Sequence, residues 1–121
     1  MPANSKIEQL RKDYSAHTLE IEEVGPDPGE QFQVWFDEAL NAEVPEPNAM
    51  TLSTATTNGV PSARIVLLKG VTNGHFLFYT NYNSRKGQEL RDNPRAALTF
   101  LWHELQRQVR IEGRVEMLSE E

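Results

Sequence analysis

The stretch 49-AMTLSTATTNGVPSARIVLLK-69 decides the fold, because it alternates apolar and polar residues on both sides of a tight-turn signal. Met50, Leu52 and Thr54 recur with a period of two, which is the period of a β-strand. Asn58-Gly59 is a strong hairpin signal, since both residue types accept the positive φ that a two-residue turn requires. The sequence therefore predicts two antiparallel strands over residues 49–56 and 62–69.

The rest of the chain predicts more strands of the same kind, together with helices. Further strands are expected at residues 75–80, 95–102 and 107–118, with Gly113 marking a bulge or bend. Apolar spacing and capping signals predict helices at residues 5–15, 29–43 and 84–92. This pattern indicates a mainly β (α+β) fold, an antiparallel barrel or sandwich with N-terminal helices and one inserted short helix.

Two units are expected along the chain. Residues 1–47 form a helical segment, which Pro45 and Pro47 end, and residues 48–121 form the strand-rich domain. The last predicted strand is followed directly by residues 119–121, so we expect the barrel to be incomplete at the C-terminus. Its open sheet edge would be covered by a partner or by further chain.

The composition excludes several classes of function. The 121 residues include no cysteine, which rules out disulfides, thiol nucleophiles and thiolate metal sites. The net charge is −6, and residues 1–60 hold 3 Lys or Arg against 11 Asp or Glu, whereas residues 61–121 hold 9 against 7. We therefore expect no nucleic-acid role but allow a local anion site in the second half. Because no apolar run approaches the roughly 20 residues of a membrane span and no signal peptide is visible, we expect a cytoplasmic protein that does not enter membranes.

The stretch 81-NYNSRKGQEL-90 places Arg85 and Lys86 at the start of the predicted short helix, behind Asn83 or Ser84 as the N-cap. Cations at this end oppose the helix dipole and lose about 0.3–1 kcal/mol each. A bound anion would reverse that effect, because free N–H groups and two positive side chains converge on a point that suits a phosphate dianion. The alternative is that both side chains are solvated surface charges.

Weaker signals lie on either side of this stretch. Arg64 and Lys69 bracket an apolar strand, and strict alternation puts them on opposite faces unless the strand bends; the alternative is an ordinary core strand with charged ends. Tyr79 and Thr80 offer hydroxyl groups directly before the basic helix. The amide of Gln108 could pair with a planar heterocycle, or it could simply be a surface residue of its strand.

Histidines and common nucleotide motifs give no catalytic signal. His103 has no carboxylate partner placed by spacing, and His17 and His75 show no metal-ligand spacing with it, so we predict a structural His103 and no metal site. The chain contains no P-loop, no GxGxxG and no Ser/His/Asp grouping.

Taken together, these motifs resemble the pyridoxine (pyridoxamine) 5′-phosphate oxidase family. The resemblance lies in RIVLLKG (64–70), FLFYTNYNSRKGQEL (76–90) and NPRAALTFLWHELQRQVRIEGRVE (93–116), with LRKDY (10–14) and EPNAMTLSTAT (46–56) upstream. It covers nearly the whole chain. It implies an FMN-binding split β-barrel and a homodimer, with one FMN in each of two clefts at the subunit interface.

The resemblance also implies roles for individual residues. The cofactor-binding set is Arg64, Ile65, Val66, Leu67, Leu68, Lys69, Tyr79, Thr80, Ser84, Arg85, Lys86 and Gln108. Arg85 and Lys86 would hold the FMN phosphate, and Gln108 would reach the flavin from the second subunit or the facing wall. The substrate would meet Arg11, Lys12, Asp13 and Tyr14, together with Lys69. No side chain is expected to act as a strong acid or base, because the flavin carries the chemistry.

The implied reaction converts pyridoxine 5′-phosphate or pyridoxamine 5′-phosphate to pyridoxal 5′-phosphate, with O2 as the electron acceptor. Chains of that family are longer than this one, and their later part carries further substrate-binding residues. We therefore expect this chain to be an N-terminal portion, with the flavin-phosphate half of the site present and the substrate half incomplete. The alternatives are a non-catalytic module that binds flavin or pyridoxal phosphate, and a split-barrel flavin reductase that uses a nicotinamide donor.

Overall fold

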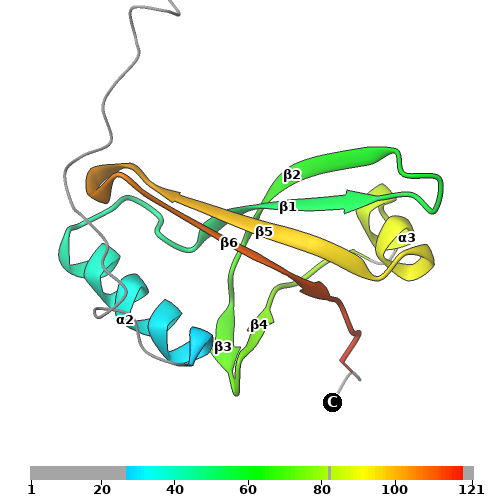
Figure 1. The fold of residues 1–121 in the computed structure, drawn as a ribbon. Helices are drawn as coiled ribbons and strands as arrows, with labels where there is room; N and C mark the ends of the chain where they lie inside the picture. The colour runs from blue at the N-terminus through cyan, green and yellow to red at the C-terminus, as the bar shows by residue number, and fades with distance from the viewer. Residues whose placement is uncertain (1–26, 82, 119–121) are drawn as a thin grey trace, which may run out of the picture.

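The computed structural model describes residues 27–81 and 83–118. Its helices are α2 (Pro28–Asn41), α3 (Arg85–Asp92) and the short 3-10 helix η2 (His103–Leu105). The strands are β1 (Ala49–Ala55), β2 (Pro61–Leu67), β3 (Gly70–Thr72), β4 (His75–Leu77), β5 (Arg95–Trp102) and β6 (Arg107–Arg114) (Figure 1). They form a four-stranded sheet of order β2-β1-β5-β6 and a two-stranded sheet of β3 and β4, and all these pairs are antiparallel. The prediction of a mainly antiparallel β fold with one inserted short helix is confirmed, whereas the helix expected at residues 5–15 lies outside the described residues.

The hairpin predicted at Asn58-Gly59 joins β1 to β2. Gly59 has a φ of 88°, a conformation that favours glycine, and its N–H donates to the carbonyl of Thr56 at 2.9 Å. The register sets Thr54 opposite Ser62, and Arg64 is the next residue on the same face of β2. Polar side chains of both strands therefore gather at one end of the inner face of the sheet.

The strands β5 and β6 complete the sheet on the other side of β1. Their pairing runs without interruption from Arg95 with Arg114 to Trp102 with Arg107. Gly113 pairs with Ala96 in this regular register, so the expected bulge at Gly113 is wrong. Glycine permits a bulge but does not impose one, and the continuous ladder of hydrogen bonds keeps this strand regular.

The β3–β4 hairpin forms the second, smaller sheet (Figure 1). Asn73 and Gly74 have φ values of 53° and 77°, both positive as a two-residue turn of this class requires. The strand predicted at residues 75–80 ends at Leu77. The sequence did not predict β3, because three residues that begin with Gly70 are too few to show a period.

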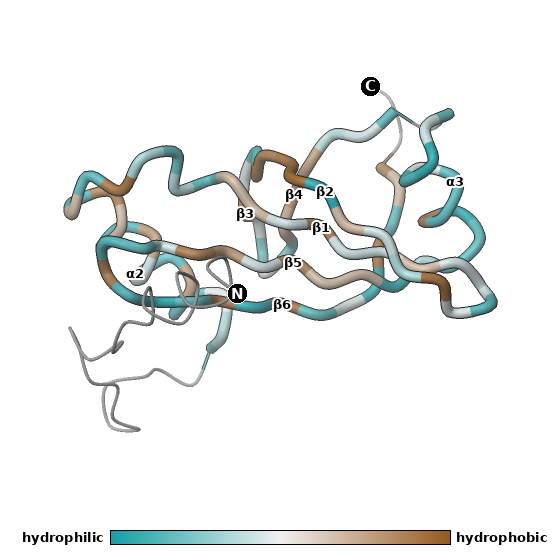
Figure 2. Tube along the Cα trace, turned by 90° about the horizontal axis from the view of Figure 1, so that it is seen from above, coloured by the Kyte–Doolittle hydropathy of each residue, from teal (hydrophilic) through white to brown (hydrophobic). Residues whose placement is uncertain are grey.

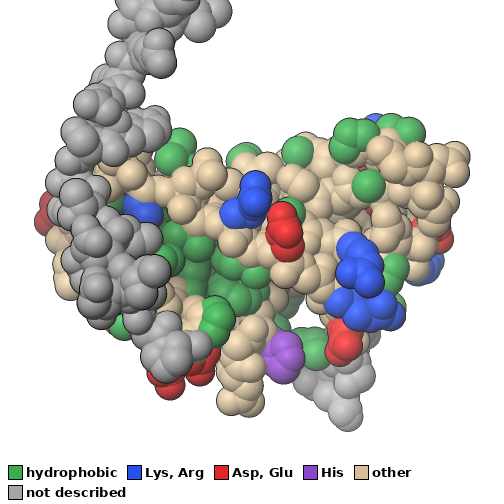
Figure 3. Space-filling model, in the orientation of Figure 1, with side chains coloured by type: hydrophobic (Ala, Val, Ile, Leu, Met, Phe, Trp, Pro, Cys, Tyr) green, Lys and Arg blue, Asp and Glu red, His purple; other side chains and the backbone are tan. Residues whose placement is uncertain are grey.

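One face of α2 and the inner face of the large sheet form the core. The most deeply buried hydrophobic residues are Phe32, Ala39, Met50, Leu52, Phe100 and Trp102. The ring centroid of Phe32 lies 4.9 Å from that of Phe76 on β4, 5.1 Å from Phe100 and 5.9 Å from Trp102. Helix α2 therefore packs against strands of both sheets. Figure 3 shows hydrophobic side chains reaching the surface on the side of the large sheet that carries α2 and the β3–β4 hairpin.

Helix α2 follows its sequence signals closely. Asp27 caps it by accepting a hydrogen bond from the Gly29 N–H at 2.9 Å, and the helix ends at Asn41, before the two prolines. Of the apolar residues whose spacing predicted this helix, Phe32 and Ala39 are buried, but Leu40 is 52% exposed. The proposed boundary at residue 47 between two units stays a prediction. Phe32, which precedes this boundary, packs against Phe100 and Trp102 of β5.

The two helices α2 and α3 lie at opposite ends of the large sheet, as the view from above shows (Figure 2). Ser84 is the N-cap of α3, which decides between the two candidates that the sequence offered. In residues 27–81 and 83–118, no helix combines the length and the apolar character needed to cross a membrane.

Candidate anion site at the start of helix α3

A pocket of about 380 Å³ lies between the edge strand β2 and the start of α3. Its lining consists of Ser62, Ala63, Arg64, Ser84, Arg85 and Lys86. The fold thus brings three cations from two separate stretches of sequence to one place. An anionic ligand is the chemistry that such a pocket favours.

The first turn of α3 adds its backbone to this pocket. The Oγ of Ser84 accepts a hydrogen bond from the Gly87 N–H at 3.1 Å and donates one to the carbonyl of Asn81 at 2.6 Å. The first N–H groups of a helix have no partner within the helix, and its dipole is positive at this end. A phosphate at this point would meet backbone donors as well as side-chain cations.

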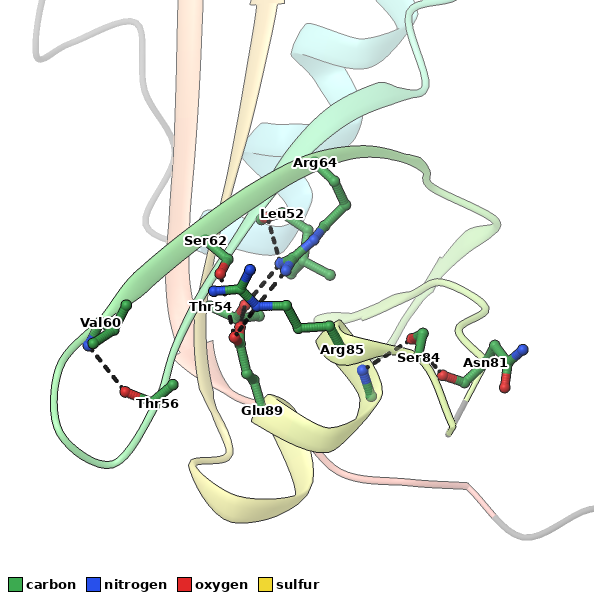
Figure 4. Close-up of polar contacts among 11 residues, drawn as sticks. Leu52, Thr54, Thr56, Val60, Ser62, Arg64, Asn81, Ser84, Arg85 and Glu89 are labelled. Atoms are coloured by element: carbon green, nitrogen blue, oxygen red, sulfur yellow. Dashed lines mark hydrogen bonds and ion pairs between the residues drawn. The ribbon is translucent and has the colours of Figure 1, made fainter.

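A carboxylate, Glu89, lies buried among the cations with 5% of its surface exposed (Figure 4). Its Oε1 accepts a hydrogen bond from Thr54 Oγ1 at 2.6 Å, and its Oε2 accepts from Ser62 Oγ at 3.2 Å and from Arg85 Nε at 3.0 Å. The Nη2 of Arg64 lies 3.6 Å from Oε1. Glu89 therefore links α3 to both strands of the β1–β2 hairpin.

These contacts keep Glu89 ionised. The hydrogen bond from Thr54, followed by that from Arg85, lowers the pKa of Glu89 below its ordinary value of 4.5, although burial acts in the opposite direction. At neutral pH the cluster of Arg64, Arg85, Lys86 and Glu89 thus has three positive charges and one negative charge, a net of +2. The site stays electropositive despite its buried carboxylate.

The two arginines of the cluster are held to different degrees. Arg64 has 22% of its side chain exposed, and its Nη1 donates to the Leu52 carbonyl at 3.1 Å and to Thr54 Oγ1 at 2.7 Å. Arg85 has 70% of its side chain exposed and contacts Glu89 through Nε. Arg64 is therefore fixed against the sheet, whereas Arg85 extends along the pocket towards solvent.

The remaining residues of the segment 64–69 divide between two faces. Val66 and Leu68 are buried in the core, so only their backbone can reach a ligand, whereas Ile65 is 67% and Leu67 is 37% exposed. Burial keeps alternating along the chain as far as Lys69, which is exposed. Arg64 therefore lies on the inner face with Val66 and Leu68, and Lys69 lies on the outer face with Ile65 and Leu67. The segment does not bend within β2 to bring both cations to one point.

Lys69, Tyr79 and Thr80 lie on the chain that leads towards α3. The Nζ of Lys69 lies 5.7 Å from the centroid of the Tyr79 ring, which is 79% exposed. The Oγ1 of Thr80 is buried, and among the described residues it has no hydrogen-bond partner. A buried hydroxyl without a partner is costly. Thr80 is not among the residues that line the pocket.

Gln108 does not lie at this pocket in its own chain. It is exposed on β6, where it pairs with Leu101, and β6 and β2 are the two opposite edges of the sheet. Three strand spacings separate these edges, which is about 14 Å. The segment Arg11–Tyr14, expected to contact substrate, lies outside the described residues.

Histidine and metal chemistry play no visible part in the described site. His75 and His103 are both exposed and do not line the pocket. In the part of the chain that the structure describes, no group of three His, Asp or Glu side chains is placed to hold a metal ion.

Sequence reasoning missed Glu89, Thr54 and Ser62. One local signal existed, because Glu89 follows Arg85 by four residues on a helix, a spacing at which opposite charges meet. The second signal was the hairpin register, which sets Thr54 opposite Ser62 once the turn is placed at Asn58-Gly59. Neither signal shows that the hairpin and α3 meet, which is a tertiary contact.

Comparison with known protein sequences agrees with these features. Residues 36–121 match the family described as pyridoxamine 5′-phosphate oxidase. Two relatives named pyridoxine/pyridoxamine 5′-phosphate oxidase come from Salinibacter ruber and a Nostoc species. The first is 61% identical over 117 residues, which is 97% of this chain and 54% of the relative, and the second is 60% identical over 114 residues, which is 94% and 53%. The chain spans about half the length of the curated relatives that it matches.

Solved structures with a similar fold include PhzG from Burkholderia lata, determined in complex with tetrahydrophenazine-1-carboxylic acid. Its TM-score is 0.76 at 30% identity, and the match covers 80% of this chain and 49% of that one. A pyridoxamine 5′-phosphate oxidase-related, FMN-binding protein from Nostoc punctiforme has a TM-score of 0.62 at 20% identity, over 76% and 48% of the two chains, and supports the fold alone. From its sequence match over residues 36–121 and its close relatives, this chain belongs to the pyridoxamine 5′-phosphate oxidase family.

Proposed function

We propose that this chain forms the FMN-binding part of an oxidase that converts pyridoxine 5′-phosphate or pyridoxamine 5′-phosphate to pyridoxal 5′-phosphate, with O2 as the acceptor. The names of its relatives support this reaction. We propose this reaction for a protein of the relatives' whole length, of which this chain spans about half.

The pocket at the start of α3 is the observation that carries the proposal. Arg64, Arg85 and Lys86 line it together with the helix N-cap Ser84. A phosphomonoester carries about −1.5 to −2 charges at neutral pH, which complements a cluster with a net charge of +2. The terminal phosphate of FMN has this charge and can receive charge-assisted hydrogen bonds from guanidinium groups.

The residues present also fit the rest of that cofactor. The buried Oγ1 of Thr80 has no hydrogen-bond partner within residues 27–81 and 83–118, and we propose that FMN supplies one. Ile65 and Leu67 expose apolar side chains beside the pocket residue Ala63 on the outward face of β2, a surface suited to a flat aromatic ring. When bound, FMN supplies the hydride-accepting chemistry, and the chain holds and orients the reactants.

Residues outside the pocket have a proposed role in binding the substrate. Lys69 is exposed and does not line the pocket. By family resemblance alone we assign Lys69 to the phosphate of the substrate, and Arg11, Lys12, Asp13 and Tyr14 to the substrate. Gln108 lies at the opposite sheet edge and can meet this pocket if it comes from a second copy. By family resemblance we propose a homodimer in which each FMN contacts both chains.

The test is a titration with FMN of a purified protein that contains this chain and has the whole length of its relatives, followed by addition of pyridoxine 5′-phosphate in air. The proposal expects a yellow complex, consumption of O2 and formation of pyridoxal 5′-phosphate. A protein that takes up no FMN would overturn it.

The alternative is a flavin-binding module without turnover. FMN uptake without any O2 consumption would support this module. Rapid bleaching of the bound flavin by NADPH alone would instead indicate a flavin reductase.

A further inference from the structure

The position of Glu89 needs a physical reason, because a buried negative charge opposes the binding of an anion nearby. Glu89 is 5% exposed and lies beside a pocket that Arg64, Arg85 and Lys86 line. Burying a carboxylate is unfavourable unless its oxygens are fully paired. Electrostatic attraction of a phosphate would be stronger with a neutral residue at this position.

The arrangement around the two carboxylate oxygens supplies that reason (Figure 4). Oε1 faces the hydroxyl of Thr54 and the guanidinium of Arg64, at 2.6 and 3.6 Å. Oε2 faces the hydroxyl of Ser62 and the guanidinium of Arg85, at 3.2 and 3.0 Å. Each oxygen therefore holds one hydroxyl and one arginine, and the hydroxyls come from the two strands of the hairpin.

Arg85 gains most from this contact. Its side chain is 70% exposed, and a free arginine side chain loses rotamer entropy on binding. Among the described residues its ion pair uses Nε, which leaves the Nη1 and Nη2 groups for a ligand. Fixing the guanidinium plane in advance reduces the entropy that a bound phosphate must overcome.

We infer that Glu89 is a positioning residue of the phosphate site, which holds the guanidinium groups of Arg64 and Arg85 in the orientation that binds a phosphomonoester. This role rests on the proposed FMN site. Glu89 does not touch the ligand, and its benefit through orientation outweighs its electrostatic opposition.

The test compares FMN with riboflavin, which has the same ring system but no phosphate. Glu89→Ala and Glu89→Gln remove the same negative charge, so a purely electrostatic role would tighten FMN binding equally in both variants. Positioning predicts the opposite: the Kd for FMN rises about tenfold or more in Glu89→Ala, equivalent to about 1.4 kcal/mol. The rise is smaller in Glu89→Gln, which keeps one acceptor oxygen, and the Kd for riboflavin stays unchanged in both variants.

A matched control is available at the other end of the sheet. Glu38 on α2 also pairs with an arginine, because its Oε1 lies 2.7 Å from Nη1 of Arg107. Glu38→Ala should leave the ratio of FMN to riboflavin affinity unchanged. Circular dichroism verifies folding, and if Glu89→Ala does not fold, Thr54→Val and Ser62→Ala each remove one hydroxyl contact to Glu89 and should weaken FMN binding in the same direction, by less.

The outcomes separate this inference from the proposed function. Wild-type protein that binds no FMN overturns the proposed function. If wild-type protein binds FMN and Glu89→Ala binds it equally or more tightly, the inference alone is overturned. An equal loss of affinity for FMN and riboflavin shows a general structural role and also overturns it.

Discussion

Arg85 and Lys86 are neighbours in sequence but have different surroundings in the fold. Arg85 donates to the buried carboxylate of Glu89 at 3.0 Å, whereas Lys86 is a half-buried residue of the pocket wall. From sequence, both cations were expected to oppose the helix dipole in the same way. The ion pair of Arg85 changes this expectation, because its removal would withdraw a donor from a buried acceptor.

Alanine substitutions of Lys86 and of Arg85 should therefore change the free energy of unfolding in opposite directions when no ligand is present. Lys86→Ala should raise the free energy of unfolding by about 0.3–1 kcal/mol, since it removes a cation from the first turn of a helix. Arg85→Ala should lower the free energy of unfolding because Glu89 loses a partner. Urea denaturation of both variants and the wild type measures this, and a shift of the same sign in both would contradict it. Both variants should bind FMN more weakly.

The lowered pKa of Glu89 predicts a pH dependence of stability. The folded protein binds the proton of this carboxyl group less readily than the unfolded chain does, mainly because of the bond from Thr54. The stabilisation is therefore fully present above the ordinary pKa of 4.5 and is lost as the pH falls through the lower folded pKa. The difference in free energy of unfolding between wild type and Glu89→Gln, measured in urea at a series of pH values, should shrink on acidification. A difference that stays constant from neutral to acid pH would count against this account.

At this scale the sequence predicted the cations but not what holds them. Arg85 and Lys86 were recognisable because positive side chains at a helix start are unfavourable without an anion. Arg64, on strand β2, entered the predicted site only through the family resemblance. The role of Glu89 depends on the contact of α3 with the β1–β2 hairpin, which no local pattern encodes.

Helix α3 begins at the pocket and depends on one capping side chain. The Oγ of Ser84 accepts from the Gly87 N–H at 3.1 Å, and the helix continues for only 8 residues. Such a short helix is marginal without its cap and its tertiary contacts. The same side chain thus supports both the helix and the anion site.

Ser84→Ala should lower the free energy of unfolding by about 1 kcal/mol, since it removes the acceptor for a first-turn N–H. Ser84→Thr keeps a hydroxyl at the cap and serves as the matched control, with a smaller expected loss. Urea denaturation of the three proteins gives the comparison. If alanine and threonine were equally tolerated, the cap would not be contributing to stability.

Elements with a long periodic pattern were mostly predictable, and short ones were not. The strand predicted at residues 107–118 starts at the predicted residue, but β6 ends at Arg114. The strand at residues 95–102 was predicted with the bounds of β5, because eight residues show their alternation clearly. The three-residue strand β3 was missed, and the strand that contains β4 was predicted too long. The pairing of each short strand with the other, through the turn at Asn73-Gly74, decides their extent.

The whole molecule is held together where α2 meets both sheets. Phe32 is 3% exposed and its ring lies against Phe76, Phe100 and Trp102. The indole Nε1–H of Trp102 donates to the carbonyl of Pro47 at 2.9 Å, which fixes the chain between α2 and β1. This core sets the position of the hairpin that carries Arg64.

Phe32→Ala should lower the free energy of unfolding by about 3–5 kcal/mol, because it leaves a cavity where a buried ring was packed. Val34→Ala, on the same helix but 54% exposed, is the control and should change the free energy of unfolding by less than about 0.5 kcal/mol. Thermal and urea denaturation measure both. Similar small effects in the two variants would show that α2 is not part of the core.

Contacts between copies of the chain are beyond what periodicity can predict. Gln108 was expected to reach the flavin from a second subunit or a facing wall, and its position on β6, the edge opposite β2, is compatible with the first of these. Its part in the site stays a prediction, because pairing of two copies depends on surface shape rather than on any period in the sequence.

A crystal structure of the protein with FMN bound tests the central claim most directly. The account predicts that the phosphate of FMN lies at the N-terminus of α3, within hydrogen-bonding distance of Arg64, Arg85 or Lys86 and of the first-turn N–H groups. A bound flavin whose phosphate is held elsewhere, while these three side chains face solvent, would contradict it.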